Sequence, residues 1–211
     1  MLPAGQPKFR RRKADRPDEI VAAALELFSE KGFAAARLDE IARRAGVSKG
    51  AIYLYFATKE DIFRAVVEQA VAPNLQSLQA MAPQAATFAE LARFFSRNVV
   101  PLLADSPIGG VVKMVIAEAR NFPELARIWH DRLVVPALGA ISMAIAAGQA
   151  RGEIRPGDPR QYAVSLISPM LLGVIWRETF TPIGAAPFDL PALAEQHVET
   201  LLRGMCLEPS A

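Results

Sequence analysis

Two short helical patterns separated by a glycine are the feature of this chain that most restricts its fold. Residues 37–59 read RLDEIARRAGVSKGAIYLYFATK. Apolar residues recur at helical spacing up to Ala45, and Gly46 follows where a left-handed turn residue is needed. The pattern predicts two helices packed across a tight turn, which is a helix-turn-helix.

The second of these helices has a surface suited to the major groove of DNA. Ser48 can cap it, and we expect it to run to about Phe56. Lys49, Gly50 and Tyr53 share one face, because positions i, i+1 and i+4 cluster on a helix. Lys49 can donate to guanine or phosphate, Gly50 allows close backbone approach, and Tyr53 can bond phosphate and touch thymine methyl groups.

Residues flanking this helix are expected to contact the DNA backbone. Tyr55 and Lys59 should point toward phosphates, and Arg37 could hold another phosphate from the start of the preceding helix. A competing interpretation makes Tyr53 and Tyr55 half-buried packing residues and Lys49 a solvated charge. The coincidence of the glycine, the helix lengths and the basic and aromatic positions favours DNA contact.

The charge distribution agrees with a polyanionic partner at the N-terminal end. Residues 1–60 carry 12 Lys/Arg and 8 Asp/Glu, whereas residues 61–211 carry 12 and 14. Residues 1–16 form a basic arm that includes Arg11 and Arg12. The arm could lie along the minor groove or phosphates, or it could be a solvated tail in the free protein.

The remaining sequence favours an all-α protein, because alanine and leucine dominate and no run alternates with period two. A first helix should begin at Pro17 and end at Gly32, and the sequence from Thr58 to Asp61 resembles a capping box that opens a fourth. Further helices are expected over residues 87–104, 108–120, 123–151, 159–180 and 189–205, with Pro101, Pro136 and Pro169 kinking or splitting three of them.

This order of elements predicts two domains behind the arm of residues 1–16. Residues 17–64 form a three-helix helix-turn-helix DNA-binding domain. Residues 65–211 form a second, helical domain. No low-complexity linker separates them, so we expect the boundary to be a shared helix.

A set of short motifs carries a resemblance to a known family. The motifs are Ala24 and Phe28 with Gly32-Phe33, Ile41-Ala42, Ala45-Gly46-Val47-Ser48, Lys49-Gly50-Ala51-Ile52-Tyr53, Tyr55-Phe56, and Lys59-Glu60 with Phe63. Residues 20–70 thus resemble the DNA-binding domain of the tetracycline-repressor (TetR/AcrR) family. The resemblance implies an all-α homodimer on a palindromic operator, usually a repressor released by a small ligand.

The resemblance also assigns roles to residues. Lys49, Gly50, Ala51 and Tyr53 occupy the positions of the family's base-contacting and groove-facing residues. The family often has a threonine just before the second helix, where this chain has Ala36 and Arg37, so the phosphate contact there differs.

A ligand cavity between the later helices is a further implication of the resemblance. Candidate wall residues are aromatic, methionine or acidic: Phe95, Met114, Glu118, Phe122, Trp129, Met143, Met170 and Trp176. Taken one at a time, the apolar members fit an ordinary core equally well.

Dimerisation through the C-terminal helices is expected from their composition. Residues 161–180 are apolar nearly all round, as in a helix buried on two sides. The uncharged stretch 161–176 contains Pro169 and is shorter than the roughly 20 residues of a membrane span, so an interface helix is favoured.

Nothing in the sequence indicates an enzyme, a metal site or a cofactor. The only histidines are His130 and His197, too few and too isolated to form a zinc site with the single Cys206. The polar residues between Glu118 and Arg132 suit structural ion pairs, with a cavity lining or a catalytic cluster as alternatives. One thiol, and basic residues 8–13 without an apolar core behind them, suit a cytoplasmic protein.

The sequence therefore predicts a DNA-binding transcriptional regulator that is released from double-stranded DNA by an unknown small apolar or amphipathic effector. The alternative is a helical small-molecule-binding protein whose basic end is incidental.

Overall fold

The computed structural model describes residues 16–69, 87–98, 100–104 and 106–207. Within these ranges all regular secondary structure is helical, apart from one isolated antiparallel bridge between Ile154 and Cys206. The all-α prediction is confirmed. Residues 1–15 of the basic arm, including Arg11 and Arg12, lie outside the described part of the chain, and Arg16 begins the first helix.

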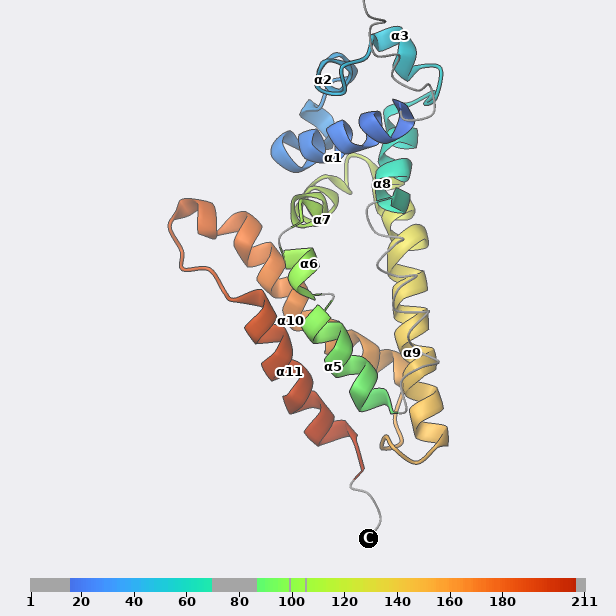
Figure 1. Ribbon diagram of the computed structural model, residues 1–211, viewed down its shortest axis with the longest axis vertical. Coiled ribbons are helices and arrows are strands. Elements are labelled where there is room, and N and C mark those ends of the chain that lie inside the picture. Colours follow the sequence, from blue (N-terminus) through green and yellow to red (C-terminus); the bar gives the residue numbers. More distant parts are fainter. Residues whose placement is uncertain (1–15, 70–86, 99, 105, 208–211) are drawn as a thin grey trace, which may run out of the picture.

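Three helices form the N-terminal end of the molecule, at the top of Figure 1. They are α1 (Arg16–Ala35), α2 (Leu38–Arg44) and α3 (Lys49–Ile52). Gly32 interrupts α1 with non-helical backbone angles, φ 80° and ψ 172°, which agrees with the predicted end of the first helix. A fourth helix over residues 59–69, here called the connecting helix, leads toward the rest of the chain.

The remaining helices build the larger part of the molecule. They are α5 (Phe88–Asn98), α6 (Val100–Ala104), α7 (Ile108–Glu118), α8 (Pro123–Trp129), α9 (Val135–Ala150), α10 (Pro159–Thr179) and α11 (Leu190–Met205). A π-helical turn, His130–Val134, joins α8 to α9, and a 3-10 turn, Thr181–Ile183, follows α10. All five expected spans are helical, and their ends agree within a few residues.

The prolines act in different ways. Residue 99 lies outside the described residues, so the expected kink or split at Pro101 stays a prediction. Pro136 follows the π-helical turn, in the first turn of α9. At Pro169 the predicted split is wrong, because α10 is continuous through this residue. Because Pro169 has no N–H, the Ser165 carbonyl lacks its usual helical hydrogen bond. The Nε2 atom of His197 in α11 lies 2.9 Å from this carbonyl oxygen.

One hydrophobic core joins the N-terminal helices to α7 and α8. The rings of Phe28, Phe33 and Phe63 meet at centroid separations of 5.4–6.2 Å. Val111 and Leu125 are buried in the same cluster, and α7 lies directly against α1. The core therefore crosses the predicted boundary at residue 64, which falls within the connecting helix; the division of the chain into domains stays a prediction.

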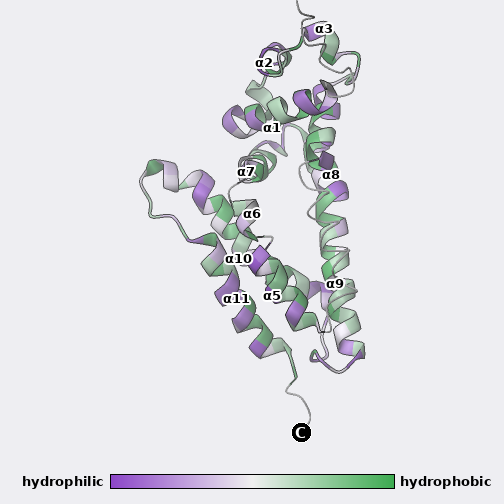
Figure 2. Cartoon of the chain, in the orientation of Figure 1, coloured by the Kyte–Doolittle hydropathy of each residue, from purple (hydrophilic) through white to green (hydrophobic). Residues whose placement is uncertain are grey.

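A second core lies at the opposite end, between α5, α9, α10 and α11, and includes Phe88, Ile145 and Val198. The apolar stretches Pro123–Ala150 and Pro159–Ile183 are long and hydrophobic enough to cross a membrane by length and composition. An interface helix of a water-soluble protein meets the same criterion. Only 11% and 17% of their apolar windows are buried within one chain, and much of α9 is hydrophobic (Figure 2).

Candidate DNA-binding surface

The turn between α2 and α3 is built as the sequence predicts. Gly46 has φ 66°, a left-handed conformation that glycine adopts without steric cost. The Ser48 side chain accepts a hydrogen bond of 3.2 Å from the Ala51 N–H and caps α3. The expected helix to Phe56 is too long, because α3 ends at Ile52. Beyond Ile52 the chain forms turns, in which the N–H groups of Tyr55 and Phe56 both donate to the Ile52 carbonyl.

The inner face of α3 is sealed against α2. Ile41, Ala42 and Ala45 are buried and face the fully buried Ile52, as expected for a helix-turn-helix core. Ala51 is also buried, with 8% of its surface exposed. The expectation that Ala51 faces the groove is therefore wrong for its side chain, because that side chain completes the inner face of α3.

The outer face of α3 is open to solvent. Tyr53 is 52% exposed, which excludes the packed position that the competing interpretation required. Gly50 has open space around it, since an added Cβ would approach only the Ser48 hydroxyl, at 3.9 Å. Lys49, Gly50 and Tyr53 thus form an exposed side of α3.

An ion pair joins this exposed side of α3 to α2. The Lys49 Nζ is 2.9 Å from Asp39 Oδ1 in α2, and both side chains are more than half exposed. The hydrogen bond that Lys49 donates to Asp39 raises the pKa of Lys49 and lowers the pKa of Asp39. Lys49 is therefore a charged donor held toward Asp39 of α2. An exposed ion pair of this kind contributes little free energy, so a phosphate can replace Asp39 at little cost.

Lys59 does not face the DNA side as expected. Its Nζ donates to the carbonyls of Phe33 and Ala36 at 2.6 and 3.1 Å, with a longer contact of 3.4 Å to Ala34, and lies 4.3 Å from the centre of the Phe33 ring. Burial lowers the pKa of Lys59. Three acceptors occupy the three donors of an ammonium group, so the predicted phosphate contact is replaced by a structural role.

Replacing Lys59 with methionine should separate these two roles. We expect a decrease of about 1–3 kcal/mol in unfolding free energy, because backbone carbonyls lose their donor. The slope of log K against log salt for duplex binding should stay unchanged. Replacing the exposed Arg37 with alanine should instead reduce that slope by about 0.9 for each phosphate that the side chain neutralises. A reduced slope for Lys59→Met would instead show that Lys59 contacts phosphate.

Other predicted residues occupy varied environments. Arg37 is exposed at the N-terminal cap of α2, with no side-chain cap bond. Tyr55 is partly buried and packs against the first core, so its ring is less accessible than that of Tyr53.

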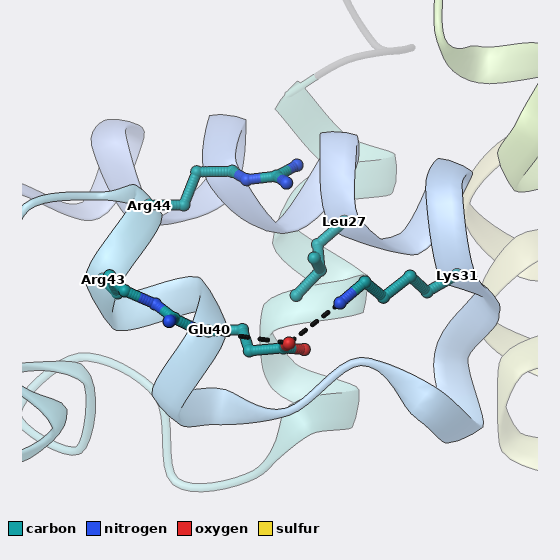
Figure 3. Close-up of a pocket in the computed structure, with 5 residues that line it drawn as sticks. All are labelled: Leu27, Lys31, Glu40, Arg43 and Arg44. Atoms are coloured by element: carbon teal, nitrogen blue, oxygen red, sulfur yellow. Dashed lines mark hydrogen bonds and ion pairs between the residues drawn. The ribbon is translucent and has the colours of Figure 1, made fainter.

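Two exposed residues near this surface were missed by the sequence reasoning. Leu54 follows Tyr53 and is 74% exposed, which is unusual for a leucine. Arg43 in α2 has a largely exposed side chain beside Glu40, in a small cleft of about 290 Å³ between α1 and α2 (Figure 3). Leu54 could have been found from its position next to Tyr53, beyond the apolar stripe of the inner face.

The predicted ligand-pocket residues lie in different environments. Met114 lies in the first core, with Phe122 and Trp129 packed against it, whereas Met170 packs against the second core. The Trp176 ring stacks with the rings of Phe180 and Phe188 and donates to the Ala186 carbonyl at 3.0 Å. Phe95 is partly buried, and Met143 is 68% exposed. These side chains belong to separate clusters, and a common lining stays a prediction.

A groove of about 360 Å³ opens elsewhere, along the π-helical turn and α9. It is lined by His130, Val134, Val135, Leu138, Gly139, Ser142 and Arg160. None of the predicted pocket residues is among them.

The polar residues from Glu118 to Arg132 do not converge on a single site. His130 contacts Asp131, Arg132 pairs with Glu68 at 3.2 Å, and Glu118 bonds backbone N–H groups of α1. Among the described residues no group of His, Cys, Asp or Glu is arranged to hold a metal ion. The arrangement is that of structural ion pairs.

A sealed three-helix core beneath an exposed lysine and tyrosine, joined to a larger helical body, defines a helix-turn-helix DNA-binding protein. Residues 20–66 match the family model of bacterial regulatory proteins of the tetR family, and residues 89–189 match the tetracyclin repressor-like C-terminal domain. The chain belongs to the TetR family and is a DNA-binding transcriptional regulator.

Individual relatives agree over nearly the whole length. The fatty acid metabolism regulator protein of Bacillus subtilis is 28% identical over 198 residues, covering 92% of this chain and 98% of its own. The fatty acid degradation regulator FadR of Bacillus halodurans shares the fold, with a TM-score of 0.77 at 24% identity over 92% of this chain and 98% of that one. FadR of Bacillus subtilis, solved with stearoyl-CoA, has a TM-score of 0.72 at 24% identity over 89% and 98%.

Proposed function

We propose that this protein is a transcriptional repressor that binds a palindromic operator as a homodimer and leaves it when a small effector binds. The observation that carries the proposal is the exposure of Lys49 and Tyr53 on one side of α3, while the other side is sealed. Outward donors on such a helix can reach phosphates and base edges. We assign the groove-facing roles to Lys49, Gly50 and Tyr53, with Arg37 on phosphate.

Dimerisation is supported by apolar surface on α10. Val164, Leu171 and Leu172 are exposed on this helix, and a monomer would leave them in water. A second copy related by two-fold symmetry would cover such a surface. The same symmetry would present two α3 helices to successive major grooves, which is why the operator should be palindromic.

The effector is proposed to be amphipathic, with a long-chain acyl-CoA as the first compound to test. Two similar proteins are named for fatty acid metabolism or degradation, and one similar structure holds stearoyl-CoA. The groove along α9 supports an amphipathic ligand, because Val134, Val135 and Leu138 lie beside Arg160. Binding between the C-terminal helices would tilt the connecting helix and change the spacing of the two α3 helices.

The proposal is tested with a duplex from the protein's own upstream region and a titration with stearoyl-CoA. We expect the wild-type protein to bind the duplex and the acyl-CoA to weaken binding, while sedimentation still reports a dimer. Release through dissociation of the dimer, or unchanged affinity, would refute this release mechanism. Stearoyl-CoA binding without any duplex binding would favour the rival function, a small-molecule-binding protein.

We further propose that the protein acts in the cytoplasm and has no catalytic activity. The single Cys206 and the scattered polar residues between Glu118 and Arg132 support both statements.

A further inference from the structure

The kink in α1 leaves two backbone donors without helical partners. Gly32 has φ 80° and ψ 172°, so the chain leaves the helix at this residue before it reaches α2. The N–H groups of Phe33 and Ala34 follow the kink and need acceptors from elsewhere.

Both acceptors are supplied by one carboxylate from the C-terminal part of the chain. Glu118, the last residue of α7, accepts from Phe33 N at 3.0 Å through Oε1 and from Ala34 N at 2.8 Å through Oε2. Gly32 makes this approach possible, because an added Cβ would overlap the Glu118 Oε1 atom. Glu118 therefore holds the segment that leads into α2 from a position about 85 residues away in the sequence.

Further contacts hold the same segment from two elements. The Phe122 ring, just beyond α7, packs on the Phe33 ring at a centroid separation of 5.3 Å. Lys59 of the connecting helix bonds the carbonyls of Phe33 and Ala36, whereas Glu118 bonds N–H groups of the same segment. The segment 33–36 is thus bonded through its N–H groups to Glu118 of α7 and through its carbonyls to Lys59 of the connecting helix.

We propose that Glu118 is a positioning residue for DNA binding, through which α7 sets the orientation of α2 and α3. The proposal rests on the function proposed above and adds a route besides the tilt of the connecting helix. A shift of α7 along α1 would lengthen one or both carboxylate bonds. The segment would then lose its fixed geometry, and the two α3 helices of a dimer would lose their fixed separation.

Glu118→Gln is the main test, because it keeps the shape of the side chain. The amide has one oxygen and turns a donor toward one of the two N–H groups, so only one of the two bonds can remain. Hydrogen exchange at Phe33 and Ala34 should become faster. Affinity for the upstream duplex should fall by about tenfold, within the usual range of coupling between sites.

A second readout separates positioning from simple destabilisation. One base pair inserted at the centre of the operator changes the spacing of the half-sites. Wild-type protein should discriminate strongly against this duplex, and Glu118→Gln should discriminate less, because its α3 helices are less firmly placed. A smaller fraction of folded protein would weaken binding to both duplexes equally.

Glu124→Gln is the matched control. It removes an equal charge at a half-exposed position in the first turn of α8, where the contacts to Arg64 and Arg127 are 3.9 and 3.7 Å long. The proposal is overturned if Glu118→Gln matches Glu124→Gln in exchange at Phe33 and Ala34, or in spacing discrimination. If no variant, nor the wild type, binds the duplex, the proposed repressor function fails and the role of Glu118 in DNA binding fails with it, whereas the exchange data still report the carboxylate bonds.

Gly32→Ala gives a second check, since it disturbs the same contact from the other side. The added Cβ would displace the carboxylate, and the positive φ is unfavourable for alanine. Its effect on spacing discrimination should not add to that of Glu118→Gln, because both changes break the same interaction. Additive effects would contradict the proposal.

Discussion

Replacing Lys49 and Tyr53 together with alanine should weaken operator binding by at least about a thousandfold. Each base or phosphate interaction of this kind contributes roughly tenfold or more to affinity, and the substitution removes both interactions from each half-site of a dimer. Both side chains point away from the core, so the melting temperature should stay near that of the wild type. Fluorescence anisotropy with the upstream duplex measures the decrease in affinity.

Arg97→Ala is the control for the removed charge. Arg97 is exposed on α5 and pairs with Glu195 of α11. In Figure 1, α5 lies in the lower part of the molecule and α3 at its top. Arg97→Ala should leave specific binding within about twofold, because phosphates beyond a Debye length of about 10 Å at 0.1 M salt hardly sense it. Full operator affinity in the double variant would mean that α3 is not the recognition helix.

Gly110→Ala should cause the largest decrease in stability among small substitutions. Gly110 is buried where α7 crosses α1, and an added Cβ would lie 2.9 Å from the Ser29 Cα, besides overlapping its side chain. Backbone atoms cannot rotate away, so the two helices must separate. We expect a decrease of about 1–3 kcal/mol in unfolding free energy, the usual cost of overpacking, which lowers Tm by roughly 2–4 °C for each kcal/mol in a chain of this size.

Gly139→Ala is the matched control, since Gly139 is also helical but has nothing within 4 Å of the added Cβ. This variant should be stabilised by about 0.5–1 kcal/mol through helix propensity. Thermal melts at one protein concentration compare the two, because a dimer's Tm depends on concentration. Equal melting temperatures for both variants would show that α7 and α1 do not pack tightly at Gly110.

The local devices of the helix-turn-helix were predictable because each involves residues close in sequence. Gly46 adopts the left-handed turn, and Ser48 caps α3 as expected. Thr58 and Asp61 exchange the capping bonds at the start of the connecting helix, each N–H to the other side chain at 3.1 Å. Spacing alone shows which residues meet within one or two helical turns.

The misjudged residues depend on partners far away in the sequence. Lys59 was predicted to bind phosphate but is occupied by carbonyls at the end of α1, more than 20 residues away. Ala51 was placed in the groove, although its side chain is buried. The pocket residues were chosen by side-chain type, and no periodicity reveals that Met114 and Met170 pack in different cores.

By itself the sequence determined the all-α class and the helix-turn-helix with its outward lysine and tyrosine, because these follow from short-range spacing. The family followed from the resemblance of its motifs. Only the tertiary structure decided that Gly110 is the crossing point of α7 on α1 and that Glu118 binds the segment after Gly32. Both depend on how two helices far apart in the chain approach each other. That approach is set by the packing of the shared core, which no local pattern encodes.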